Sequence, residues 1–278
     1  MQSFHQKRFY SFRADANALG GFLEEPVQKI IPTVAPVSLP AVGGFATARS
    51  ERFNLDEIVS CSAAYTRVSG SEHHPDGSIS ILTTAVVEDL NLLEVVTAER
   101  LVAQVSITIP GGSNQLEISL AGSRFEGLRL AGRLSEPTLN PVLCPPGGGK
   151  AGPGRPLSWQ DVQKAGQAQA QRLINDLKVR GDKDADLWAQ NRHGWMIANP
   201  PVTDGNLLCS LVDGLNANGS YQSCGHIVEI PGFGRFFLGE LFVSRDSVQL
   251  VAIRAELGCP VKGKIGVCTG GGGGKGEN

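Results

Sequence analysis

Residues 101–120, LVAQVSITIPGGSNQLEISL, decide the fold class. From Leu101 to Ile109 every second side chain is apolar, which is the period expected of a strand with one buried face. Residues 110–114, PGGSN, interrupt this alternation, and residues 116–120 resume it. A turn-rich break between two alternating runs predicts an antiparallel hairpin.

Further strands are predicted around this hairpin. Residues 79–87 and 125–130 are its expected neighbours, and β character also marks residues 9–23, 58–68, 227–230, 235–243 and 247–257. Four prolines between residues 26 and 40 confine residues 27–42 to an extended strap. We therefore predict a mainly β fold, an antiparallel β-sandwich-like single domain. A β-solenoid or prism is the alternative, because alternation reports a half-buried strand and not its neighbours.

The predicted domain covers residues 8–262, with an insertion at residues 141–225. The insertion begins with a proline- and glycine-rich linker, PPGGGKAGPG, at residues 145–154. Ser158 followed by Asp161 is typical of a helix start, and Leu173, Ile174 and Leu177 would share one face. We predict one amphipathic helix at about residues 159–180. Residues 263–278, with five consecutive glycines, are expected to form a disordered tail.

Charge and hydropathy argue against two classes of partner. Lys plus Arg number 25 and Asp plus Glu 27, for a formal net charge of −2. Without a long basic stretch, nucleic acid is a poor partner. No run approaches the roughly 20 apolar residues that span a bilayer, so the chain is not expected to be transmembrane. The sequence as given shows no Sec signal, which indicates a cytoplasmic protein or another export route. The oligomeric state stays open.

Motifs for chemistry are sparse. Gly147–Lys150 lacks the spacing and the Ser or Thr of a phosphate-binding loop, and no cofactor is predicted. His73, His74 and Asp76 are weak candidates for a divalent metal, in a stretch that also suits a solvated turn. The six cysteines show no CxxC pair and suit either buried thiols or disulfides. No catalytic residue is predicted.

Glu240 is the one carboxylate expected on a buried strand face. It lies between Leu238 and Phe242, on the side that also carries Phe236. A buried carboxylate is costly unless it is paired, and Arg254 on the next strand is the expected structural partner. An anchor for loop amides and a functional acid are the alternatives.

The order of several short segments resembles the bacterial choice-of-anchor proteins, especially their P group. The segments are residues 12–21 (FRADANALGG), 38–44 (SLPAVGG), 87–93 (VEDLNLL), 96–99 (VTAE), 122–128 (GSRFEGL) and 230–240 (IPGFGRFFLGE). The resemblance implies an exported β domain without an agreed activity, in which Glu240 has a structural role. This chain departs from the pattern by its insertion and by showing no signal peptide, sorting motif or hydrophobic anchor.

Three functions follow from these observations. The first is a non-enzymatic structural, surface or binding module that recognises protein or glycan through its loops. The second is a metal-assisted hydrolase or lyase, with a site built around residues 193–229 from residues such as His193, Asp204, His226 and Glu229. The third is an intracellular assembly subunit.

Overall fold

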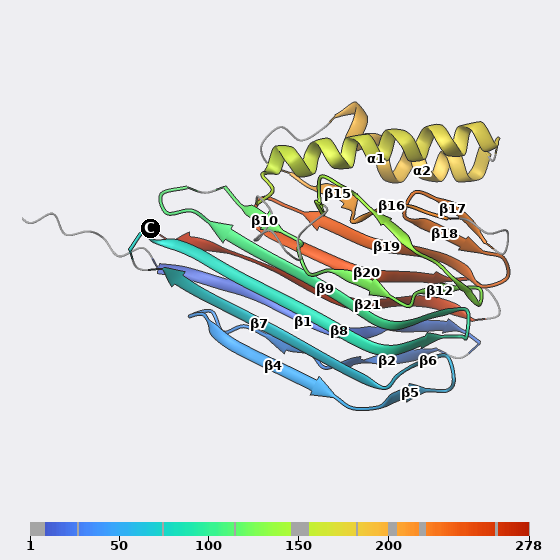
Figure 1. Cartoon of the computed structure of the whole chain (residues 1–278), viewed down its shortest axis with the longest axis horizontal. Helices are drawn as coiled ribbons and strands as arrows, with labels where there is room; N and C mark the ends of the chain where they lie inside the picture. Colours follow the sequence, from blue (N-terminus) through green and yellow to red (C-terminus); the bar gives the residue numbers. More distant parts are fainter. Residues whose placement is uncertain are drawn as a thin grey trace, which may run out of the picture.

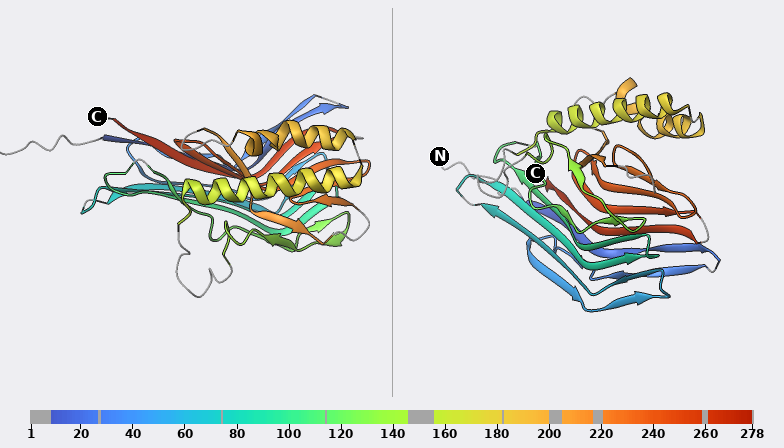
Figure 2. Two further views of the ribbon diagram at one scale, coloured as in Figure 1. Left: turned by 90° about the horizontal axis from the view of Figure 1, so that it is seen from above. Right: turned by 45° about the vertical axis from the view of Figure 1, so that its right-hand side comes forward.

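Two antiparallel sheets face each other and two helices lie over one of them (Figures 1 and 2). The computed structural model describes residues 9–26, 28–73, 75–113, 115–145, 156–181, 183–199, 205–216, 221–258 and 261–277. The main core lies between the sheets, with Phe236 and Leu238 from one and Leu101 and Ile107 from the other fully buried. This arrangement confirms the predicted mainly β, sandwich-like fold.

Sheet B contains the predicted hairpin. Strand β9 (Val96–Ile109) pairs with β10 (Glu117–Ser119) as expected, and its other neighbours are β8 (Ser78–Leu92), β11 (Arg124–Glu126) and β12 (Arg129–Leu130). The remaining strands of this sheet in the described part are β4 (Gly44–Ser50), β5 (Phe53–Leu55), β6 (Val59–Cys61), β7 (Ala63–His73) and β13 (Arg133–Leu134).

Sheet A joins the first described strand to the last. Its order is β17 (Gln222–Cys224), β18 (Ile227–Ile230), β19 (Gly234–Val243), β20 (Ser247–Leu257), β21 (Lys262–Glu277), β1 (Phe9–Glu25) and β2 (Lys29–Val34). Strand β15 (Leu207–Ser210) also pairs with β19, and β3 (Val37–Ser38) with β1. Strands β14 (Pro137–Leu139) and β16 (Val212–Leu215) form a separate pair. The predicted insertion thus supplies strands to sheet A.

The predicted disordered tail at residues 263–278, and the domain boundary at residue 262, are wrong. Strand β21 pairs along its length with β1 on one side and with β20 on the other. Its inward glycines face sheet B at close range: a Cβ on Gly270 would come within 2.7 Å of Thr83, and one on Gly272 within 2.8 Å of Ile81. Glycine is needed here because the sheets approach too closely for side chains.

A row of irregular positions crosses sheet A at Ala18, Cys268, Ala252 and Gly239. Pairing skips this row: Asn17 faces Thr269, whereas the next registered pair is Leu19 with Val267, and β19, β20 and β21 skip their members likewise. Gly239 and Cys268 have φ of 62° and 49°. As at a β-bulge, the inward face changes from one alternating set of residues to the other.

This row corrects the predicted face of Glu240. Leu238 and Phe236 face the main core, but Glu240 lies beyond Gly239 and faces the helices, and Phe242 is 40% exposed. Arg254 is likewise on the outer face, although Val248, Leu250 and Ala252 of its strand are buried in the main core.

The predicted helix is α1 (Trp159–Arg180), and its capping is as expected. Ser158 Oγ accepts a hydrogen bond from the Asp161 amide at 3.3 Å, and the Asp161 carboxylate accepts one from the Ser158 amide at 2.9 Å. Gly181 ends the helix with φ of 75°. The buried Gln169 ties α1 to sheet A, since its side chain bonds both the amide and the carbonyl of Ser210.

Replacing Ser158 with alanine is expected to lower the free energy of unfolding by about 1 kcal/mol, because the Asp161 amide at the helix start loses the side-chain oxygen that accepts its hydrogen bond. Denaturant unfolding with Ser71→Ala, an exposed serine on β7, as the control measures this. Equal stability of the two variants would contradict the assigned cap.

A second helix, α2 (Lys183–Ala198), was not predicted from the sequence. It turns back along α1, and both helices lie over the β15–β19 side of sheet A (Figure 2). Its buried face carries Ala189, His193 and Met196. One small residue, one polar ring and one long apolar side chain do not make a recognisable apolar stripe.

Candidate functional site

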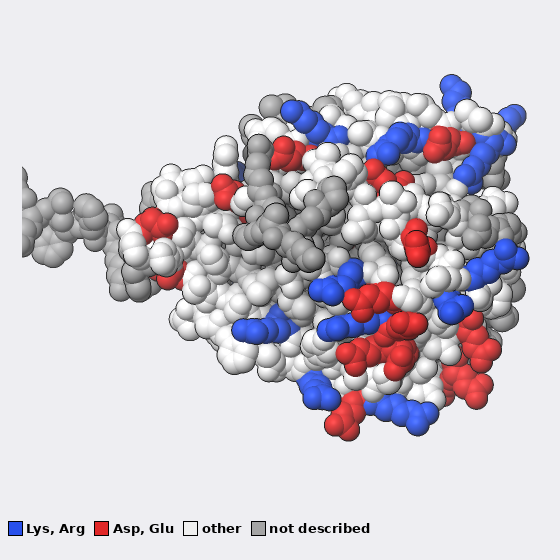
Figure 3. Space-filling model, in the orientation of Figure 1, with Lys and Arg blue, Asp and Glu red and all other residues white. Residues whose placement is uncertain are grey.

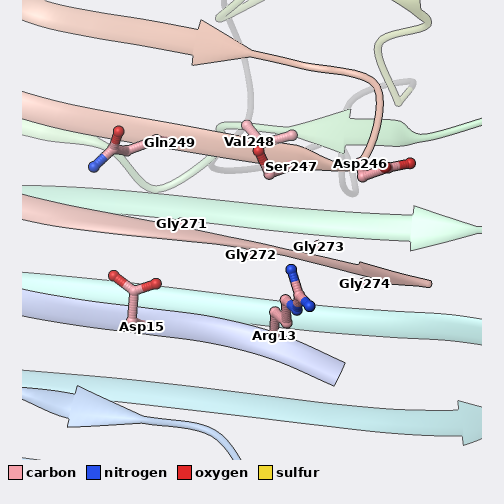
Figure 4. A pocket seen from close by; sticks show the side chains of 10 residues that line it. All are labelled: Arg13, Asp15, Asp246, Ser247, Val248, Gln249, Gly271, Gly272, Gly273 and Gly274. Carbon is pink, nitrogen blue, oxygen red and sulfur yellow. The ribbon is translucent and has the colours of Figure 1, made fainter. Parts of the chain in front are cut away.

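A groove of about 400 Å³ opens on the outer face of sheet A, away from sheet B (Figure 4). Side chains of β1 stand on one side of it and those of β20 and the preceding turn on the other, with β21 between them. The lining residues are Arg13, Asp15, Asp246, Ser247, Val248, Gln249, Gly271, Gly272, Gly273 and Gly274. We call this site the glycine groove.

Strand register places four polar side chains at the corners of a rectangle. Arg13 and Ser247 both pair with Gly273, from opposite sides, and Asp15 and Gln249 both pair with Gly271. Two strand spacings separate the sides by roughly 10 Å, and two residues along a strand separate the ends by roughly 7 Å. The floor between them is backbone.

The floor cannot easily carry side chains. A Cβ on Gly271 would lie 2.4 Å from the carbonyl oxygen of Val248, and one on Gly273 would lie 1.8 Å from that of Asp246. Thr83 of sheet B donates a hydrogen bond to the Gly271 carbonyl at 3.2 Å, which braces the floor from below. The groove is therefore a consequence of packing and keeps its shape.

The charged side chains of the groove are Arg13, Asp15 and Asp246, for a formal charge of −1. Partial burial raises the pKa of Asp15. Asp15 therefore suits a neutral ligand with hydrogen-bond donors better than an anion.

The predicted partners Glu240 and Arg254 meet beneath helix α2, and neither lines the glycine groove. The Arg254 Nε atom lies 2.5 Å from Glu240 Oε2, and Arg192 of α2 donates to Glu240 Oε1 at 2.6 Å. Glu240 is 6% exposed. The Arg254 guanidinium also lies 3.7 Å from the ring centroid of Phe237.

Two histidines named for the alternative enzyme site lie in the same cluster. The rings of His193 and His226 have centroids 6.1 Å apart and are each 4% exposed. His226 Nε2 is 3.9 Å from Glu240 Oε1, beyond hydrogen-bond distance. We call His193, His226, Glu240, Arg192 and Arg254 the buried cluster.

The other two residues of that alternative do not join the buried cluster in the described structure. Glu229 has a side chain 55% exposed and lies 3.8 Å from Arg235. Asp204 is outside the described residues.

Burial and neighbouring charges set the ionisation of this cluster. Burial alone would raise the pKa of Glu240, but the His226 ring and the Arg254 guanidinium outweigh it and hold that pKa well below its usual range. Burial lowers the pKa of His193 to about 3, and His226 and Arg192 add to the effect. At pH 7 Glu240 is thus ionised and paired with two guanidinium groups, and His193 is neutral.

The weak metal candidates are not assembled into a site in the described structure. The Asp76 carboxylate accepts a hydrogen bond from the Ser78 amide at 2.9 Å, as in a turn, and His73 ends β7. His74 lies outside the described residues. Within the described ranges, no three His, Cys, Asp or Glu side chains are grouped to hold a metal ion.

Five cysteines lie in the described ranges, and each has a free thiol: Cys61, Cys144, Cys209, Cys224 and Cys268. Cys259 is outside those ranges. Burial raises the pKa of Cys144 to about 11, which does not suit a nucleophile at neutral pH.

The molecular face over sheet B mixes both signs of charge (Figure 3). Arg100 lies 4.0 Å from Glu88, and Arg124 lies 3.2 Å from Glu126. Among the residues drawn, this face has no continuous basic surface for a phosphate backbone. Of the two described helices, neither is long and apolar enough to cross a membrane.

Sequence reasoning missed the glycine groove. The signal that could have revealed it is the pair of charges at Arg13 and Asp15, two residues apart on a predicted strand whose intervening Ala14 is buried. The glycines opposite them were assigned to a tail, so no floor was expected.

Comparison with known proteins finds one family. A family model described as a domain of unknown function, DUF8256, matches residues 9–244. No curated protein matches the chain, and no solved structure matches it. The resemblance to choice-of-anchor proteins stays a prediction.

Proposed function

The chain belongs to the DUF8256 family, a domain of unknown function, and from that premise we propose that it is a non-enzymatic binding module that holds a neutral glycan in the glycine groove. The observation that carries the proposal is the rectangle of Arg13, Asp15, Ser247 and Gln249 around a backbone floor. A sugar ring can lie on a floor without side chains, while its hydroxyl groups meet hydrogen-bond partners along both sides.

The chemistry of the four side chains suits hydroxyl groups. Asp15 accepts hydrogen bonds, Arg13 donates them, and Gln249 and Ser247 do both. Hydroxyl groups also do both, so a glycan can form a hydrogen bond with each of the four side chains. The formal charge of −1 disfavours acidic sugars.

The buried cluster supports this choice over a hydrolase. A general base needs a carboxylate or imidazole that can reach a substrate proton. The Glu240 carboxylate is held by Arg192 and Arg254 at 2.6 and 2.5 Å, and both histidine rings are buried under α2. These contacts favour a role in holding the helices.

The proposal is tested on an array of neutral and acidic oligosaccharides, followed by calorimetric titration of the best neutral ligand. Asp15→Ala is expected to weaken binding by about tenfold or more, since a hydrogen bond to a charged group is lost, and Gln249→Ala by about threefold to tenfold, the range for a neutral hydrogen bond. The controls are Glu72→Gln on β7 and Gln160→Ala on α1, both exposed and outside the groove.

Binding of acidic glycans alone, or of extended peptides in place of glycans, would contradict the proposal. So would equal affinity of the groove variants and the controls. Melting temperatures within a few degrees of the parent protein establish that the groove variants are folded.

A further inference from the structure

Two buried imidazole nitrogens at the junction of α2 with sheet A have no hydrogen-bond partner among the described residues. They are the Nε2 atoms of His193, on α2, and of His226, in the turn before β18. Buried polar atoms are nearly always hydrogen-bonded, so two such atoms facing one junction need an explanation. The proposed glycan site does not use them.

The charges around His193 are balanced only while its ring is neutral. Glu240 accepts from both Arg192 and Arg254, and Arg254 also donates to Glu256. A proton on His193 would add a positive charge beside Arg192, Arg254 and His226. The Glu240 carboxylate already pairs with the two guanidinium groups and cannot balance a third charge.

The ionisable groups that face this junction come from every element packed there. They are Arg192 on α2, His226 in the turn before β18, Glu240 and Arg235 on β19, Arg254 and Glu256 on β20, Asp176 and Arg180 on α1, and Cys224 on β17. Among these groups, Glu240 is the carboxylate whose field favours a proton on His193, and Arg192 and Arg254 oppose it.

The apolar contacts of α2 form a unit partly separate from the sandwich core. Ala189 of α2 packs in a small cluster with Leu173, Ile174 and Leu177 of α1, Cys224, Ile227 and Phe237. The residues buried between the two sheets belong to the other, larger cluster, which Met196 of α2 also joins. Loss of the small cluster leaves the contacts between the sheets in place.

We propose that the buried cluster is a proton-sensitive latch: it holds α2 on sheet A at neutral pH, and a proton on His193 releases α2 while the two-sheet sandwich stays folded. The charged form of His193 is stable only with water around it, so the proton and the opening of the helix go together.

The sign of the pH dependence follows from the lowered pKa of His193. In the released helix the pKa returns to its ordinary value of about 6.5, so the released state binds one more proton than the docked state at pH values between the two. The docked state is therefore fully stable above about pH 6.5, and its stability is lost as the pH falls toward the docked value.

Hydrogen exchange followed by mass spectrometry at pH 7.5 and 5.0, corrected for intrinsic exchange rates, tests the latch on the whole chain. One extra proton raises the opening constant of residues 183–198 tenfold per pH unit below about 6.5, roughly 30-fold at pH 5.0. Amides of β8 and β9 should keep their protection.

In His193→Leu the opening constant of residues 183–198 at pH 5.0 should exceed that at pH 7.5 by about twofold or less. His73→Gln, at an exposed histidine of sheet B, should keep the ratio of the parent protein. His193→Gln, which also lacks a titrating ring, gives the same reading if the leucine variant does not fold. The latch is excluded if the parent shows no pH dependence, if the His193 variants retain it, or if β8 and β9 lose protection together with α2.

Discussion

Glu240→Ala will lower the free energy of unfolding by about 3–5 kcal/mol, the range for removing one partner of a buried ion pair. The variant leaves the guanidinium groups of Arg192 and Arg254 facing each other under α2. Their side chains are only 29% and 22% exposed, so water replaces the carboxylate poorly. Chemical denaturation at pH 7 measures the loss.

Glu229→Ala is the matched control for this prediction. Glu229 belongs to the neighbouring strand β18, but its side chain is 55% exposed and its contact with Arg235 is 3.8 Å. An exposed pair of this kind contributes about 0.5 kcal/mol or less. If the two alanine variants were equally stable, the buried cluster would not hold the helices.

Gly271→Ala is expected to destabilise the protein by about 3 kcal/mol, at the upper end of the range for overpacking. The new Cβ would lie 2.4 Å from the backbone carbonyl oxygen of Val248 and 3.1 Å from the Cα of Gln249. Backbone atoms in the middle of sheet A cannot move aside without breaking the pairing of β20 with β21. Thermal melting measures the loss.

Gly214→Ala serves as the comparison, because a Cβ there meets no atom within 4 Å and its φ is unstrained. That substitution should leave stability unchanged or raise it slightly, since alanine loses less backbone entropy than glycine. A folded Gly271→Ala variant as stable as Gly214→Ala would mean that β21 is not fixed between its neighbours.

The hairpin of sheet B could be predicted because every second side chain reports the buried face. The same rule failed for β21, since glycines have no side chains to alternate and a close approach of two sheets selects for their absence. It also misplaced Glu240, because the bulge at Gly239 changes the inward face within one strand. The predicted pairing of Glu240 with Arg254 is nevertheless present, because a buried carboxylate needs a partner on whichever face it lies.

The candidate sites were harder to predict from the sequence than the strands. The glycine groove needs the register that sets Asp15 and Gln249 on either side of Gly271, and no local pattern specifies a pairing over so many intervening residues. The buried cluster needs α2, whose buried face of Ala189, His193 and Met196 gives a weak periodic signal. His193 and His226 were named without the helix that brings them together.

The position of β21 between β1 and β20 also sets the order in which the protein can fold. Strands β7, β8 and β9 are joined by short turns, so sheet B can nucleate from local contacts. Sheet A cannot be completed until Leu19 finds Val267, a loop closure over most of the chain. Until then β1 and β20 each lack a neighbour, and their unpaired edges are open to other chains. Late closure of sheet A is therefore the step at which we expect folding and aggregation to compete.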